Sequence, residues 1–401
     1  MTWGAIEPAE SSASRLRLDF GLRSAILRFN EWAVPGLGGA FFVRQLSWGC
    51  MGLRLVQELQ GQSSAARIAE GIEALASWIS VRDSEAGVED DRVQGKRKFA
   101  EVSALSFDAV SRGGAYVTVP FRRAATRALP GLGFCHEEAR FNALSLTQHG
   151  SELAESAMAD VDARGRLVDW LEAGTTEIQR VTRTLRKSLL PEFATDSERA
   201  LVRRQVLAHE GRRTIAGLLH QIPVDELAGE QGRGRFLEGL PDPAMRARLA
   251  TCFAFEDLRA ASLAAAQEVG DAIHGGPLTA SSLAVRGGVR ACFAALEKEA
   301  SALGTRLTQD APAEAAAFCA EQAAGGPLAT RVLALCARVP MIFSVFGERI
   351  DQGIGYTGKL AADDPYGAAE SNEGRQLPIP RPVIRLRRLL NEAGENFADA
   401  G

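Results

Sequence analysis

The chain has 401 residues, of which 46% are hydrophobic and 24% charged, and this ordinary globular composition excludes a disordered or collagen-like protein. Its 46 Lys and Arg residues against 50 Asp and Glu residues give a net charge of -4, which excludes a wholly basic nucleic-acid binder. Any anionic partner must therefore bind a local basic patch. A chain of this length exceeds the size at which one hydrophobic core usually stops growing, so several lobes are expected.

Cysteine and histidine positions argue against a disulfide framework and a metal site. The 6 cysteines contain no C-x-x-C pair, which favours reduced and mostly buried thiols. No two of the 5 histidines have the spacing of a zinc site, so neither a metal nor any other cofactor is predicted. Residues 353–358 match G-x-G-x-x-G, but no βαβ pattern surrounds them and a loop is expected.

The apolar runs are shorter than the roughly 20 residues of a membrane span, and the first 15 residues lack a signal-peptide pattern. We therefore expect a cytoplasmic protein without membrane contact.

Periodic apolar residues predict helices along most of the chain, whereas strand-like alternation is scarce. Buried helical faces are expected over Ala40 to Leu59 and Ala65 to Ile79, and a long helical stretch over Leu167 to Leu190. The prediction is a mainly α, multi-lobed helical protein with an internal winged-helix-like α+β segment. The expected divisions are an N-terminal helical lobe (1–82), an acidic linker or loop (83–95), the winged-helix-like segment (96–160), a helical region (161–346) and a loop-rich tail with a closing helix (347–401).

Residues 96–158 depart from the helical rhythm. Lys96 to Val110 is expected to form one helix and Pro120 to Leu129 a second, which would bury Phe121 and three alanines and expose its arginines. A small hairpin with its return strand at Arg140 to Leu146 is expected to follow, and then a helix at Ser151 to Met158.

Leu146, Thr147, Gly150 and Leu153 form the pattern Leu-Thr-x-x-Gly-x-x-Leu, and Leu-Pro-Gly-Leu-Gly precedes it at 129–133. This order resembles the C-terminal half of winged-helix transcriptional regulators, in which a strand leads through a Leu-Thr-x-x-Gly turn into a final helix. The resemblance covers residues 96–158 alone. It implies a winged-helix fold for this segment, whose use stays open between nucleic-acid contact, protein contact and a spacer role.

Two basic stretches are candidates for phosphate contact. Residues 92–127 hold eight positive and two negative side chains, and residues 180–214 hold nine positive and four negative side chains. Residues 136–162, between these stretches, carry six acids and one arginine. A solvated helical face with Glu–Arg pairs is the competing interpretation of the second stretch. The predicted nucleic-acid-binding residues are Arg97, Lys98, Arg122, Arg123, Arg127, Arg183, Arg186, Lys187, Arg203, Arg204, Arg212 and Arg213.

The function expected from these features is a non-enzymatic, nucleic-acid-associated or assembly subunit with protein partners, such as part of a bacterial regulatory or antiviral-defence complex. One alternative depends on Arg204 and His209, whose Arg-x(4)-His spacing resembles HEPN-type ribonucleases. That resemblance implies metal-independent cleavage, with the arginine on the phosphate and the histidine as acid or base. A purely structural interaction protein is the third possibility.

Overall fold

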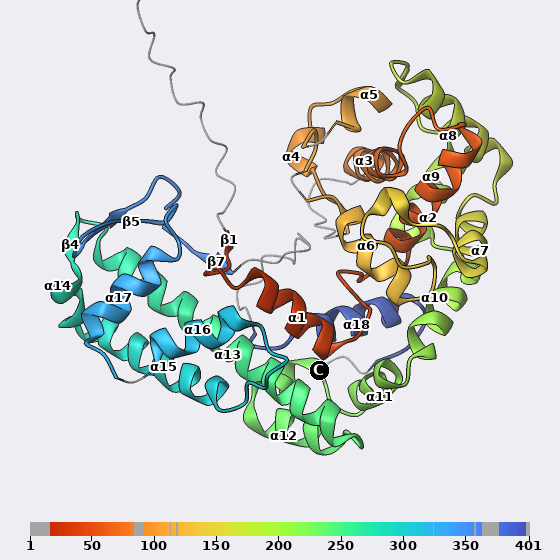
Figure 1. The fold of residues 1–401 in the computed structure, drawn as a ribbon. Helices are drawn as coiled ribbons and strands as arrows, with labels where there is room; N and C mark the ends of the chain where they lie inside the picture. Colours follow the sequence, from red (N-terminus) through yellow and green to blue (C-terminus); the bar gives the residue numbers. More distant parts are fainter. Residues whose placement is uncertain are drawn as a thin grey trace, which may run out of the picture. The chain divides into compact units, whose positions relative to one another are not determined.

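The computed structural model describes residues 17–83, 92–112, 114–117, 119–323, 325–356, 358–362 and 377–397. Most of these residues are helical, which confirms the predicted mainly α fold class (Figure 1). The chain divides into two compact units, one made of residues 1–29 and 250–365 and the other of residues 30–249 and 366–401. We call them unit 1 and unit 2. Residues 84–91 of the expected acidic linker lie outside the described residues.

Unit 1 combines helices with a small antiparallel sheet of strand order β4-β6-β5. The hairpin of β5 and β6 pairs Phe346 with Arg349 at its tip, and β1 pairs with β7 in parallel. Residues 353–356 and 358 follow this hairpin outside regular structure, and the Tyr356 hydroxyl donates a hydrogen bond to Asp271 at 3.1 Å. The elements are β1 (Arg17–Leu18), α1 (Arg23–Ala33, which continues into unit 2), α13 (Pro243–Ala272, which begins in unit 2), β4 (Leu278–Thr279), α14 (Ala280–Ala284), α15 (Gly287–Gly304), α16 (Ala313–Gln322), α17 (Leu328–Ala337), β5 (Phe343–Phe346), β6 (Arg349–Gln352) and β7 (Ala361–Ala362).

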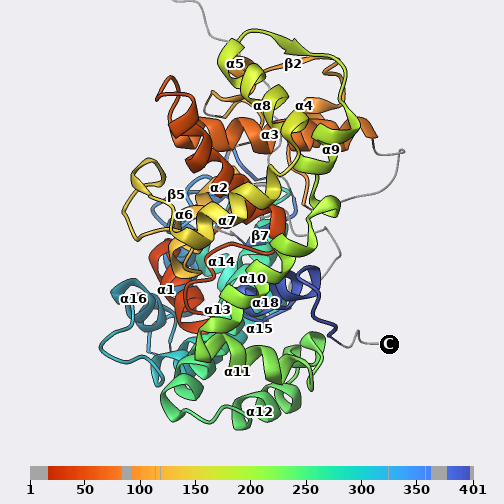
Figure 2. The same ribbon diagram turned by 90° about the vertical axis from the view of Figure 1, so that its right-hand side faces the viewer.

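Unit 2 is built around α2 and α3, which pack against each other and against α6 (Figure 2). Its only sheet among the described residues is the antiparallel pair of β2 and β3. The elements are α2 (Val43–Glu58), α3 (Ala65–Asp83), α4 (Lys96–Phe99), β2 (Leu105–Ser106), α5 (Phe107–Val110), α6 (Phe121–Gly131), the 3-10 turn η1 (Phe141–Ala143), α7 (Gln148–Ala157), α8 (Val161–Ala173), β3 (Glu177–Ile178), α9 (Arg183–Leu189), η2 (Pro191–Phe193), α10 (Asp196–Ala208), α11 (Glu210–Leu219), η3 (Val224–Ala228), α12 (Glu230–Glu238) and α18 (Arg381–Glu392).

The helices α2 and α3 confirm the two apolar periodicities at the start of the chain. Leu46, Cys50 and Leu53 are buried on α2, and nearly the whole helix is enclosed by its neighbours. A Cβ atom at Gly52 would lie 2.6 Å from the Ala69 side chain, so a glycine at this position lets the two helix backbones approach closely. This close pair forms the centre of the unit 2 core.

The C-terminal helix α18 closes unit 2 through the carboxylate of Glu392. This carboxylate accepts a hydrogen bond from the Val43 backbone amide at 2.9 Å, where α2 begins, and it pairs with Arg92 at 3.0 Å. Arg199 donates to the Glu392 carbonyl at 2.8 Å. Burial raises the pKa of Glu392, and Arg92 and the Val43 amide oppose that shift. The last helix thereby joins the first helix of unit 2 to α10.

Three predicted elements are wrong in their extent. Lys96 to Val110 is not one helix, because α4 and α5 flank the short strand β2. Arg140 to Leu146 is not a return strand: it holds the 3-10 turn η1, and only Cys135 and Leu146 form a bridge. Leu167 to Leu190 divides into α8 and α9, and Gly174 follows α8 with a φ of 58°.

The Leu-Thr-x-x-Gly turn does lead into a helix, as expected. Thr147 is the N-cap of α7, and its hydroxyl accepts a hydrogen bond from the Gly150 amide at 3.2 Å. The Thr147 amide also donates to the Phe134 carbonyl at 3.0 Å, which fixes the turn against the segment after α6. These local features do not test the winged-helix resemblance of residues 96–158, which stays a prediction.

Gly150 should be intolerant of even a methyl group. A Cβ atom there would lie 2.0 Å from the Phe134 carbonyl oxygen, so the backbone has to shift. We expect Gly150→Ala to lower the free energy of unfolding by about 1–3 kcal/mol in urea denaturation. Gly165→Ala on α8 is the matched control, because a Cβ there meets nothing within 4 Å and should stabilise the helix by about 0.5–1 kcal/mol. Equal effects of the two substitutions would contradict this account.

Candidate nucleic-acid interface

The helix α6 exposes two of its three arginines. Its buried face includes Phe121 and three alanines, as the sequence predicts. Arg122 lies beside Glu70 of α3, to which its Nε donates at 2.6 Å, so its charge is neutralised within the fold. Arg123 and Arg127 are exposed and make no ion pair with a described residue. Four residues apart, they lie on one side of the helix about 6 Å apart along its axis.

A buried carboxylate holds the N-terminus of α6. The Glu73 side chain on α3 accepts hydrogen bonds from the Phe121 amide at 2.8 Å and the Arg122 amide at 3.3 Å. Glu73 is only 1% exposed, and burial raises its pKa to about 7 although Tyr116 and the two amides oppose the shift. The negative charge of Glu70 adds to the increase. The position of the exposed arginine pair therefore depends on an acid that titrates near neutral pH.

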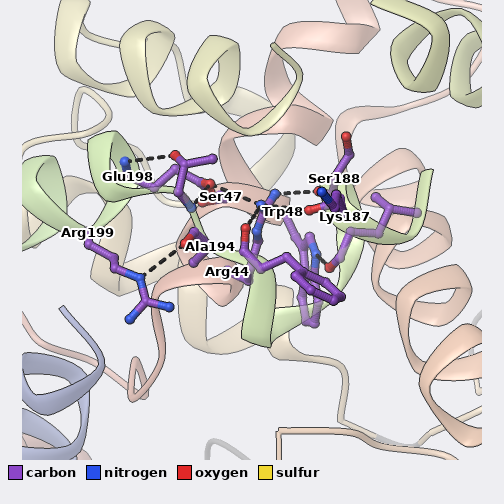
Figure 3. A network of polar contacts seen from close by, with 11 residues as sticks. Arg44, Ser47, Trp48, Lys187, Ser188, Ala194, Glu198 and Arg199 are labelled. Atoms are coloured by element: carbon purple, nitrogen blue, oxygen red, sulfur yellow. Dashed lines mark hydrogen bonds and ion pairs between the residues drawn. The ribbon is translucent and has the colours of Figure 1, made fainter. Parts of the chain in front are cut away.

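Arg44 of α2 contacts the C-terminal end of α9 (Figure 3). The Arg44 guanidinium donates hydrogen bonds to the Ser188 carbonyl, to the Lys187 carbonyl at 3.1 Å and to the Phe193 carbonyl at 2.8 Å. It also pairs with Glu198 at 3.1 Å, and both side chains are fully buried. This single cation thus fixes the end of α9 and the turn that follows it.

Two neighbours complete the Arg44 network. Ser47 donates its hydroxyl to Glu198 at 2.6 Å, and the Trp48 indole donates to the Leu189 carbonyl at 3.0 Å. Glu198 in turn closes a capping box with Thr195 at the start of α10. Burial lowers the pKa of Arg44, and the charge of Glu198 opposes that shift.

The solvent side of α9 carries a second pair of cations. Arg183 and Lys187 are exposed, four residues apart, and make no ion pair with a described residue. Arg186 is half-buried and has partners within the fold. Both α6 and α9 pack against α3, so a single helix supports the two exposed cation pairs.

Arg212 belongs to the core and not to an interface. It is 3% exposed, and its guanidinium donates to the carbonyls of Val206 at 2.8 Å, Pro35 at 2.8 Å and Gly131 at 2.9 Å. Burial lowers its pKa to about 10. These contacts join the end of α6 to the turn between α10 and α11. Its neighbour Arg213 is exposed and makes no ion pair with a described residue.

The remaining predicted cations on α10 are paired with acids. Arg203 lies 3.8 Å from Glu395, and Arg204 lies 3.8 Å from Glu152 of α7, while both arginines stay largely exposed. Such exposed pairs contribute little stability, and either arginine can exchange its carboxylate for a phosphate.

His209, the histidine of the ribonuclease alternative, is the N-cap of α11. Its Nδ1 accepts a hydrogen bond from the Gly211 amide at 3.1 Å. Burial and the nearby charge of Arg212 lower its pKa, and the charges of Glu31 and Glu210 oppose the shift.

The last two predicted cations lie on α4. Lys98 donates to the carbonyls of Gly114 and Ala115, each at 2.9 Å, and therefore ties α4 to the loop that precedes α6. The side chain of Arg97 lies outside the described part of the chain.

The structure therefore separates the predicted cations by their contacts. Arg186 has partners within the fold, Arg203 and Arg204 are exposed but paired with acids, and the side chain of Arg97 lies outside the described residues. Arg122, Arg212 and Lys98 hold the fold together, whereas the exposed group without an ion pair to a described residue is Arg123, Arg127, Arg183, Lys187 and Arg213. Sequence reasoning did not include Arg180, an exposed cation just before α9, among the site residues. It also missed Glu73. No local sequence pattern marks this residue, because its hydrogen-bond partners lie 48 and 49 residues away.

The described residues contain no candidate metal site and no candidate membrane-spanning helix. They contain no group of three or more His, Cys, Asp or Glu side chains placed to hold a metal ion, and no described helix is both long and apolar enough to cross a bilayer. All 6 cysteines are free thiols, and five of them are buried. Comparison of the chain with protein-family models, with curated proteins and with solved structures finds no match.

Glu73 should make stability depend on pH. Its pKa is about 7 in the folded chain against 4.5 for an ordinary glutamate, so the folded state binds the proton more tightly than the unfolded state. This contribution is fully present below about pH 4.5 and is lost as pH rises through 7, with a total change of about 3 kcal/mol. We expect Glu73→Gln to flatten the decline between pH 5 and about 8 in urea denaturation. An unchanged pH profile in this variant would rule out Glu73 as the titrating group.

Proposed function

We propose that unit 2 binds nucleic acid without catalysing a reaction on it, and that the chain acts as a nucleic-acid-associated subunit. The observation that carries this proposal is the pair of exposed cations on each of two helices, Arg123 with Arg127 and Arg183 with Lys187. On α6 and α9 these cations are exposed without an ion pair to a described residue, whereas Arg122 and Arg186 have partners within the fold. Phosphate contact by such side chains fixes a polymer without reading its sequence.

The way these helices are held supports the proposal. Glu73 fixes the start of α6, and Arg44 fixes the end of α9, so the two pairs stand on ordered backbone and not on loops. Because the supporting contacts are buried, little further ordering of the main chain is needed on binding. Rigid placement of this kind suits the regular spacing of phosphates along a strand.

The ribonuclease alternative receives no comparable support. Arg204 lies beside Glu152, and one ring nitrogen of His209 caps a helix. His209 therefore has a structural explanation in the fold and Arg204 is paired with an acid, and non-enzymatic binding is the function that we put forward.

Salt titration tests the proposal directly. Each phosphate contact contributes about -0.7 to the slope of log affinity against log salt on single strands and about -0.9 on duplexes. Four cations should therefore give a slope of about -3 or steeper between about 50 and 200 mM salt, measured by fluorescence anisotropy. We expect the double variant Arg123→Gln/Arg127→Gln to weaken the slope by about 1.4 on a single strand.

The matched control changes two exposed arginines of unit 1, Arg290→Gln and Arg306→Gln, which have no ion pair with a described residue. It removes the same net charge and should leave the slope unchanged. A parent chain with no salt-dependent binding, or equal losses in the two double variants, would show that the pairs on α6 and α9 are not the binding surface.

A further inference from the structure

A groove of about 270 Å³ lies on unit 2 between α8 and α9, next to the cations of α9. Figure 2 shows these two helices close together, and they pack against each other. One wall is a single face of α8 that presents Arg166, Asp169, Trp170 and Ala173 at helical spacing. The rest of the lining comes from the chain between the helices and from α9, namely Thr176, Ile178, Arg180, Thr182 and Leu185.

The floor of the groove is apolar and firmly held. Trp170 is 3% exposed, its indole donates to the Leu105 carbonyl at 3.0 Å, and its ring packs edge-on against Phe107. Because this contact joins α8 to β2 and α5, the groove is a formed feature of the fold. A preformed concave surface with an apolar floor and a few polar groups is typical of a ligand site.

The rim carries charges of both signs at separate places. Arg180 is exposed and makes no ion pair with a described residue, and the exposed cations Arg183 and Lys187 follow it on α9. Arg166 already pairs with Asp162 at 3.1 Å. Asp169 is exposed without an ion pair to a described residue, so a carboxylate is available as a hydrogen-bond acceptor.

These features would suit a ligand with three chemical parts. Arg180 suits an anion, Asp169 suits a hydroxyl or amino donor, and the floor suits a flat apolar body. A nucleotide has all three parts, and a carboxylate that accepts from a ribose hydroxyl is a known means of recognising ribose. An apolar amino acid would also match the groove lining, but it would make no contact with the cations Arg183 and Lys187 farther along α9.

We propose that this groove holds one ribonucleotide of a single-stranded RNA, with the phosphate at Arg180 and a ribose hydroxyl at Asp169. The inference rests on the proposed function, and it adds a preference for RNA over DNA, because the 2'-hydroxyl is the group that distinguishes the two polymers. Arg183 and Lys187 would then contact the phosphates of the neighbouring nucleotides.

Paired RNA and DNA oligonucleotides of one sequence test the preference, with affinity measured by fluorescence anisotropy. The parent chain should bind the RNA strand about tenfold more tightly, which is the effect of one hydrogen bond to a charged group. Asp169→Asn should weaken this preference, because the amide oxygen accepts a neutral hydrogen bond in place of a charge-assisted one, and it should not weaken DNA binding, because it removes a negative charge. Glu172→Gln, at an exposed position of α8 outside the groove lining, is the matched control and should retain the preference.

Arg180→Gln should weaken binding of both strands and lower the salt slope by about 0.7, whereas Arg140→Gln at an exposed position elsewhere in unit 2 should not. Competition by uridine monophosphate would show that a free nucleotide fits the groove. If uridine monophosphate does not compete but Asp169→Asn still weakens the preference for RNA, the site binds a nucleotide only within a strand.

Equal affinity for RNA and DNA in the parent chain, unchanged by Asp169→Asn, would overturn the groove inference. Binding that still depends on Arg123 and Arg127 in that case would leave the proposed function standing. The inference would also be overturned if an apolar amino acid abolished the preference for RNA as a competitor and uridine monophosphate did not.

Discussion

The buried guanidinium of Arg44 is the contact on which the arrangement of unit 2 depends. It lies on the central helix α2 and reaches the carbonyls at the end of α9, the 3-10 turn η2 and the carboxylate that caps α10. A buried charge costs free energy unless nearly every donor finds an acceptor, so the four segments have to meet in one geometry. An apolar side chain at this position would tolerate several arrangements. The cation therefore specifies where α9 lies, and with it the direction of the charges that α9 exposes.

Arginine has two uses in this chain, and its abundance hides the difference. Arg44, Arg212 and Arg259 are almost fully buried, and each directs its planar fork at carbonyls or a carboxylate. Because 41 of the 46 basic residues are arginines, a sum of charges over a stretch counts these internal groups together with the exposed ones. The second basic stretch illustrates this: it includes Arg212, whose charge lies inside the protein.

Sequence periodicity predicts the elements whose structure is set by local pattern. The helices α2, α3 and α6 follow from apolar spacing, and the start of α7 follows from the Thr147 cap. The break between α4 and α5 could not be predicted, because the chain there is fixed by indole groups of Trp78 and Trp170, which donate to the carbonyls of Val102 and Leu105. The candidate interface is subject to the same limit. Whether an arginine is exposed or paired depends on acids such as Glu395 and Glu152, which are distant in sequence.

The order of segments in unit 2 affects how it can form on the ribosome. Its chain leaves at residue 249 and returns at residue 366, after the whole middle segment of unit 1 has been made. The carboxylate of Glu392 accepts a hydrogen bond from the first residue of α2 and neutralises Arg92, so both partners wait until residue 392 has been translated. Domains usually fold from the N-terminus as they are synthesised. In this protein α2 emerges long before the helix that completes its surroundings, so the Val43 amide and Arg92 lack their shared partner until α18 has been made.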